Sequence, residues 1–409
     1  MSSEPMYDLL LTGATVIDPS QSLSAIRDVA VTGDRIVEVA ENIQGDTRRR
    51  IDLSGRILTP GFIDIHAHLY AGSTSWGIRA DALCLATGVT TVVDAGSAGW
   101  ANFWGFEENI AATSRTQILA FVHISGIGLT YGPLGELEDI RYACPERTAA
   151  IISAWPETCV GVKIRMGRFQ LGDNGIAPLK LAVEAATATK TPIMAHLGPG
   201  IDLPEVLETL RPGDIITHCY HDKGDDIFGD GERILPAVWE ARERGVLFDV
   251  GHGGGSFAFH IARKALAQDF TADVISTDLH CASLEDPVYS LPETASKLLN
   301  LGVPLDDVIR QCTTAPAESI QRGDEFGTLR TGTIADLAAF EVEQDGAFEF
   351  HDIRDERLVG SQNLRPVLTV RAGSVFDPDD LADERETDRL RSMRMKALGK
   401  GDIDTFLRG

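Results

Sequence analysis

Two histidines, one residue apart, follow an apolar stretch near the start of the chain. Residues 60–68 have the sequence PGFIDIHAH, which predicts a short strand bounded by proline and glycine. Successive side chains of a strand point to opposite faces, so His66 and His68 share one face. Two imidazoles in this arrangement can bind one divalent ion. The pair alone is equally compatible with a polar strand end, so the assignment depends on ligands from other strands.

A lysine on the inner face of a second apolar run offers a different kind of ligand. In residues 159–165 (CVGVKIR), valine and isoleucine alternate with other residues, which places Lys163 and Arg165 on the face opposite the helices. An unpaired buried ammonium is costly. Lys163 therefore either forms an ion pair with a buried carboxylate or reacts with CO2 to give an anionic carbamate that can bridge two metal ions.

Further residues of ligand type stand at the ends of later apolar runs. His196 follows residues 193–195, His218 follows 215–217 and Asp278 follows 274–277. Ligands from five strands, all at carboxyl ends, indicate one shared site. The predicted metal ligands are His66, His68, Lys163, His196, His218 and Asp278.

The elements that must position these residues alternate between short apolar runs and helical segments. Eight such runs predict an α/β fold with a closed (β/α)8 TIM-type barrel, whose active site lies at the carboxyl ends of the strands. An open doubly wound sheet is the alternative, but no G-x-G-x-x-G motif opens a helix. We expect a small composite β-domain from residues 1–57 plus 326–376, a barrel at 58–325 and a charged tail at 377–409.

The amino-acid composition limits the classes of molecule that the protein is expected to bind. The formal charge of −24 argues against nucleic acid or an anionic membrane as a partner, because both require basic surfaces. The six cysteines show no C-x-x-C spacing, and no stretch of about 20 apolar residues occurs, which predicts a cytoplasmic protein with reduced thiols. We expect a small-molecule substrate, and a homo-oligomer is left open.

Taken together, these motifs resemble the amidohydrolase superfamily of binuclear metal-dependent hydrolases. The resemblance rests on the 60–68 motif, Lys163, the later histidines, Asp278, and the closing patterns TTAPA (313–317) and GTIADL (332–337). Within the superfamily, the chain resembles the amidohydrolase/deacetylase-type branch, often labelled dihydroorotase-like. The segments DAGSAG (94–99), GHGGGSF (251–257) and STDLH (276–280) carry that closer likeness.

The resemblance implies a site with two divalent metal ions, and zinc is the expected ion. His66, His68 and Asp278 would hold the first ion, His196 and His218 the second, and a CO2-derived carbamate on Lys163 would bridge them. A hydroxide between the ions would attack the scissile carbonyl, with Asp278 as general base. Similar proteins are esterases or deacetylases, which implies an ester or amide substrate bearing a carboxylate, such as an acetylated 2-hydroxy acid.

Four residues are expected to bind that substrate, and two other functions are kept as alternatives. A dihydroorotase or hydantoinase-type cyclic-amide hydrolase is one alternative, although dihydroorotases carry an arginine where this chain has Tyr70. A non-catalytic scaffold homologue is the other, and the presence of all six ligands argues against it. The expected substrate-binding residues are Arg165, His252, Gly254 and His280.

Overall fold

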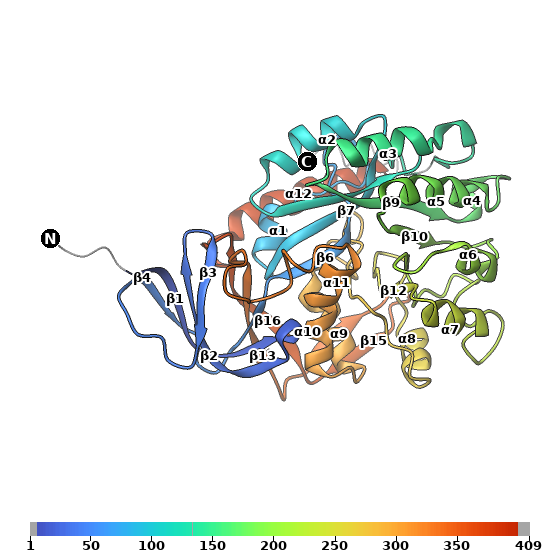
Figure 1. The fold of residues 1–409 in the computed structure, drawn as a ribbon. Helices are drawn as coiled ribbons and strands as arrows, with labels where there is room; N and C mark the ends of the chain where they lie inside the picture. Colours follow the sequence, from blue (N-terminus) through green and yellow to red (C-terminus); the bar gives the residue numbers. More distant parts are fainter. Residues whose placement is uncertain (1–5, 133, 400–409) are drawn as a thin grey trace.

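The barrel is a curved parallel sheet whose strands follow one another in sequence order. The computed structural model describes residues 6–132 and 134–399. Seven strands are hydrogen-bonded in the order β12-β11-β10-β9-β8-β7-β6. Helices lie along the outer side of these strands (Figure 1). The strands are β6 (Phe62–Ala67), β7 (Val89–Gly99), β8 (Gln117–His123), β9 (Cys159–Met166), β10 (Ile193–Leu197), β11 (Ile215–Thr217) and β12 (Leu247–Asp249).

The helices that cover the barrel come mainly from the segments between its strands. Helix α5 packs against β9 and β10, and α3 packs against β8 and β9, as expected for βαβ units. The helices are α1 (Asp81–Leu85), α2 (Phe103–Asn109), α3 (Pro145–Ala154), α4 (Arg168–Leu171), α5 (Ala177–Thr189), α6 (Leu203–Thr209), α7 (Pro236–Glu243), α8 (Phe259–Leu266), α9 (Leu291–Asn300), α10 (Leu305–Cys312) and α11 (Thr314–Ser319).

The eighth position of the barrel differs from the prediction of a closed eight-stranded sheet. Residues 274–279 form no regular strand, and their β-pairing with the two edge strands is limited to isolated bridges, Asp249 to Val274 and Ala67 to Leu279. The hydroxyl groups of Ser276 and Thr277 are instead bonded to buried carboxylates. The φ of 48° at Asp278 turns the chain out of the extended conformation. Local polar contacts therefore replace the expected ladder of backbone hydrogen bonds.

A second sheet contains strands from both ends of the chain. Its order is β17-β16-β13-β5-β1-β2-β3, and β4 pairs with β1. In Figure 1, β1 to β4 lie to one side of the barrel. The apolar run 57–65 is divided between the two sheets, with β5 in this sheet and β6 in the barrel, whereas the exact domain bounds stay a prediction. The strands are β1 (Tyr7–Asp18), β2 (Leu23–Thr32), β3 (Arg35–Ala40), β4 (Thr47–Asp52), β5 (Ile57–Pro60), β13 (Leu337–Glu343), β16 (Asn363–Arg371) and β17 (Ser374–Phe376), with a separate hairpin of β14 (Phe348–His351) and β15 (Arg357–Gly360).

The charged tail contains a long helix that packs on the barrel. Helix α12 (Ala382–Gly399) contacts α1, and Arg115 forms an ion pair of 2.6 Å with Glu384. Arg389 pairs with Glu285. The rest of the predicted tail, residues 400–409, lies outside the described residues. Among the residues that the structure describes, no helix is long and apolar enough to cross a bilayer.

Gly61 joins the two sheets at a point with no room for a side chain. A Cβ there would lie 2.1 Å from Thr90 Oγ1 and 2.5 Å from Thr90 Cγ2, and Thr90 is buried. We expect Gly61→Ala to lower the free energy of unfolding by about 1–3 kcal/mol, the usual effect of overpacking. Urea denaturation measures the change. Gly231→Ala is the control, because the nearest atom to its new Cβ would be 3.4 Å away. Equal losses in both variants would contradict the packing argument.

Candidate metal centre

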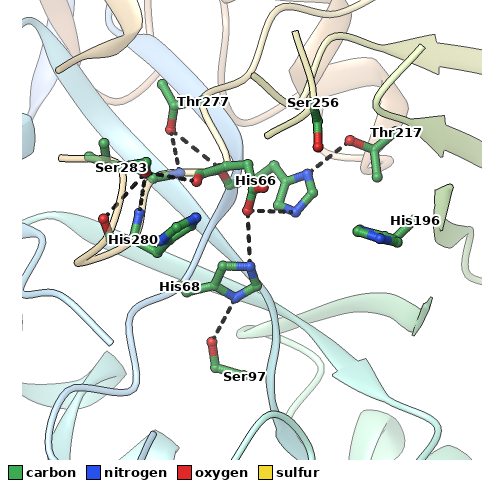
Figure 2. A network of polar contacts seen from close by, with 12 residues as sticks. His66, His68, Ser97, His196, Thr217, Ser256, Thr277, His280 and Ser283 are labelled. Atoms are coloured by element: carbon green, nitrogen blue, oxygen red, sulfur yellow. Dashed lines mark hydrogen bonds and ion pairs between the residues drawn. The ribbon is translucent and has the colours of Figure 1, made fainter. Parts of the chain in front are cut away.

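His66 and His68 are turned towards one carboxylate oxygen by hydrogen bonds on their other ring nitrogens. His66 Nδ1 lies 2.9 Å from Thr217 Oγ1, and His68 Nδ1 lies 3.1 Å from Ser97 Oγ (Figure 2). The Nε2 atoms of both rings then face Asp278 Oδ1, at 3.4 Å from His66 and 3.0 Å from His68. Both rings are buried. The structure thus brings together three predicted ligands, two from the end of edge strand β6 and one from the segment 274–279 beside it.

A buried carboxylate fixes the tautomer of His66. Thr217 and Ser276 each donate a hydroxyl hydrogen bond of 2.7 Å to Asp249 Oδ2. Since the Thr217 hydrogen is used in this way, Thr217 Oγ1 accepts the hydrogen on His66 Nδ1, and His66 Nε2 keeps its lone pair. Asp249 was not predicted from the sequence, although its position as the last residue of a barrel strand was an available signal.

Asp278 is held in an unusual backbone conformation by its neighbours. Its φ of 48° lies in the left-handed region that favours glycine. Thr277 donates its backbone N–H and its hydroxyl to Asp64, at 3.1 and 2.5 Å. A Cβ on Gly253 would lie 2.3 Å from Asp278 Oδ2, so only glycine leaves space for the carboxylate. The glycine-rich segment 251–257 therefore shapes the site from behind Asp278.

Lys163 lies beside His66, as the alternation along its strand predicted. Its Nζ is 3.2 Å from His66 Nε2, and the side chain is fully buried. Burial lowers the pKa of Lys163 to about 7, against a partly opposing effect of Asp278. A substantial share of this side chain is therefore a neutral amine at neutral pH. Gly96 leaves space for it, because a Cβ there would lie 2.5 Å from Lys163 Cβ.

His196 and His218 face each other on neighbouring strands. His196 Nδ1 lies 2.7 Å from His218 Nε2, and His218 Nδ1 lies 2.6 Å from the carbonyl oxygen of Gly251. Burial lowers the pKa of His196 far below its usual value and that of His218 to about 3, so both rings are neutral. His218 Nε2 is 4.0 Å from Asp278 Oδ2. Asp278 thus lies within reach of both histidine pairs.

The donor atoms suit divalent metal ions. One ligand atom each of His66, His68 and Asp278 lies within 4.8 Å of the others. Burial, followed by the charge of Lys163, lowers the pKa of His66 far below its usual value, which leaves the neutral imidazole that metals require. Nitrogen donors with a carboxylate oxygen are typical of zinc and related ions. The residues at this site are therefore suitable ligands for the divalent metal ions that the sequence predicts.

These side chains open into a cavity of about 420 Å³. Of the predicted substrate-binding residues, Arg165, Gly254 and His280 line it. His280 stacks on Trp76, with 5.7 Å between the ring centroids. Gly255, in the glycine-rich loop singled out from the sequence, also lines the cavity, and the lining residues not predicted from the sequence are Trp76, Phe169, Gln170, Pro199, Lys223, Ser256 and Ala282.

His252 and Tyr70 do not line the cavity and instead contact neighbouring residues of the protein. His252 is buried behind the glycine-rich loop, where Lys297 Nζ lies 3.0 Å from its Nε2 and its ring stacks on Phe257. The cavity lining does not include it. Tyr70 is buried as well, and its hydroxyl donates to the carbonyl oxygen of Asn102 at 3.1 Å. The position at which dihydroorotases carry an arginine is therefore turned away from the cavity here.

Arg165 has a partner within the protein. Its Nε and Nη2 donate to the two carboxylate oxygens of Glu136 at 2.7 and 2.6 Å, and its guanidinium lies 5.1 Å from the Trp76 ring centroid. Burial raises the pKa of Glu136, but the hydrogen bonds from Arg165 and His123 outweigh it and bring the pKa to about 2. The Arg165 charge is thus neutralised by a buried carboxylate.

A TIM-type barrel with histidine and carboxylate donors at its strand ends defines the class of metal-dependent hydrolases, and the comparisons agree. The profile of the amidohydrolase family matches residues 259–375. A deacetylase of Agrobacterium fabrum is 38% identical over 320 residues, which cover 77% of this chain and 78% of the relative. The chain therefore belongs to the amidohydrolase family, in its dihydroorotase-like branch, and is a metal-dependent hydrolase.

Two solved structures share the complete fold. The crystal structure of an adenine deaminase has a TM-score of 0.85 and is 32% identical in sequence. The match covers 91% of this chain and 100% of that chain. The crystal structure of a dihydroorotase has a TM-score of 0.83 and 33% identity, covering 90% of this chain and 99% of the other. Proteins with three different activity names thus share this architecture, so the fold does not fix the substrate.

The Glu136–Arg165 pair gives a prediction about stability and pH. A carboxyl whose pKa falls from 4.5 to about 2 on folding stabilises the protein by about 3 kcal/mol. The pKa is lower in the folded state, so this stabilisation is complete above about pH 4.5 and is lost as the pH falls towards 2. We expect Glu136→Gln to lose about 3 kcal/mol at pH 7, and less at pH 3.

Urea denaturation of both proteins from pH 7 to pH 3 measures this difference. Glu138→Gln is the control, because Glu138 is exposed in the same loop. A difference between wild type and Glu136→Gln that stays constant over the whole range would contradict the assignment.

Proposed function

We propose that the protein hydrolyses an ester or amide bond of a small substrate that carries a carboxylate, such as an acetylated 2-hydroxy acid. The observation that carries the proposal is the set of imidazole nitrogens that meet at Asp278 in an open cavity with Lys223 on its wall. The deacetylase name of the Agrobacterium relative supports removal of an acetyl group.

In this proposal, His66, His68 and Asp278 would hold one divalent ion, and His196 and His218 would hold a second. When bound, the ions would supply an activated water and polarise the scissile carbonyl. Asp278 would accept a proton from the water and pass it to the leaving group. The hydrogen bonds at His66 Nδ1 and His68 Nδ1 keep both rings oriented throughout.

Lys163, as a carbamate, would supply an anionic oxygen ligand shared by the two ions. Its neutral Nζ attacks the carbon of CO2, a C–N bond forms, and one amine proton leaves to solvent. The product is an anionic oxygen ligand, which also removes the cost of burying an ammonium beside His66. The burial of Lys163 and its pKa of about 7 support this, since only the neutral amine reacts.

Replacing Lys163 should remove the bridge. We expect zinc-loaded wild type to contain about two ions per chain by elemental analysis, and Lys163→Ala to contain one or fewer. Carbon-13 NMR in labelled bicarbonate should show a carbamate signal that the variant lacks. Lys180→Ala, an exposed lysine on α5, is the matched control. Full metal content in Lys163→Ala would exclude a bridging role.

Replacing Asp278 tests the proton transfer. Asp278→Asn keeps the shape of the side chain but removes the base and one negative charge. We expect kcat to fall by about 10²–10⁴-fold, the usual contribution of a positioned general base, or more where the metal is also weakened. Metal content and circular dichroism check that the site and fold remain. A loss of less than about tenfold would move the role to another residue, with His280 next.

The substrate class is tested with a panel at saturating zinc. Acetylated 2-hydroxy acids should be hydrolysed faster than their neutral methyl esters, by about 10²-fold in kcat/KM, which corresponds to about 3 kcal/mol of charged hydrogen bonding. Dihydroorotate and adenine belong in the panel because the two similar solved structures bear the names of those activities. If either proves the best substrate, the proposed function is wrong.

A further inference from the structure

Lys223 lines the same cavity as Arg165, but the two cations have different polar partners. It lies between β11 and α7, and its Nζ donates a 3.1 Å hydrogen bond to Ser256 Oγ. Both residues line the cavity that holds the metal ligands. A Cβ on Gly255 would lie 3.3 Å from Lys223 Nζ, so this glycine leaves space beside the ammonium.

The two cations of the cavity wall differ in their counter-charges. Arg165 is bonded through two nitrogens to the buried Glu136 carboxylate, so its charge is compensated within the protein. Among the described residues, no carboxylate oxygen lies within 4.0 Å of Lys223 Nζ, whose one hydrogen-bond partner there is the Ser256 hydroxyl. Asp278 and Asp222 attract this ammonium from a greater distance, but no carboxylate contacts it, so it can still donate to an anion.

Ser256 adds a second donor at the same place. Its oxygen accepts from Lys223, and its backbone N–H donates to the carbonyl oxygen of His252, which fixes the residue on the loop. The hydroxyl hydrogen itself has no acceptor among the described residues. An ammonium and a hydroxyl side by side can donate to the two oxygens of one carboxylate.

We propose that Lys223 and Ser256 bind the substrate carboxylate and that Arg165 does not. The pair belongs to the cavity of the metal ligands, so a bound carboxylate would lie in the same space as the scissile group. This inference rests on the proposed function and makes it more specific. It also assigns a role to the segment after His218 and to the end of the glycine-rich loop.

Equilibrium binding tests this assignment separately from turnover. Titration calorimetry on zinc-loaded protein compares mandelate, a 2-hydroxy acid, with its neutral amide. We expect wild type to bind mandelate at least tenfold more tightly. Lys223→Met should lose at least tenfold in mandelate affinity and leave the amide unchanged, Lys223→Arg should keep most of the preference, and Ser256→Ala should lose a few-fold. Lys180→Met is the matched control.

The outcomes separate the two proposals. Retention of the acid preference by Lys223→Met would overturn the role of Lys223 and leave the proposed function standing. Equal binding of acid and amide by wild type would overturn this inference together with the carboxylate requirement of the proposed function. Thermal unfolding of each variant shows whether a loss has a structural cause, and Lys223→Arg keeps the test valid if Lys223→Met unfolds.

Discussion

The site depends on one constraint: the Asp278 carboxylate and several buried imidazole nitrogens lie within contact distance of one another. Asp278 Oδ1 is 3.0 Å from one ring nitrogen and 3.4 Å from another, and Lys163 Nζ approaches the second ring within 3.2 Å. Nitrogen lone pairs and carboxylate oxygens that face one another are costly unless something positive lies between them. Divalent ions meet that need, and the hydrogen bonds at His66 Nδ1 and His68 Nδ1 hold the rings ready for them.

Much of the site could be predicted because strand ends are visible in sequence. Alternation placed Lys163 inward, and the apolar runs located His196 and His218 correctly at the carboxyl ends of β10 and β11. The eighth strand was wrong, since periodicity does not show that Ser276 and Thr277 would bond to buried carboxylates instead of extending the ladder.

The polar partners of the charged residues could not be predicted from the sequence, because they come from loops with no periodic signal. Glu136 lies 29 residues before Arg165 and cancels its charge, whereas Lys223 is left without a carboxylate among the described residues. The left-handed backbone at Asp278, and the space that Gly253 leaves for its carboxylate, likewise depend on contacts between distant segments. Local patterns identify which residues can do chemistry, but tertiary contacts decide which charges stay available to a ligand.

Anomalous diffraction at the zinc edge, from crystals grown with zinc and bicarbonate, tests the central claim most directly. We expect two peaks, one against His66, His68 and Asp278 and one against His196 and His218, with density extending from Lys163 Nζ to both. A single peak beside an unmodified Lys163, or peaks away from these side chains, would contradict it.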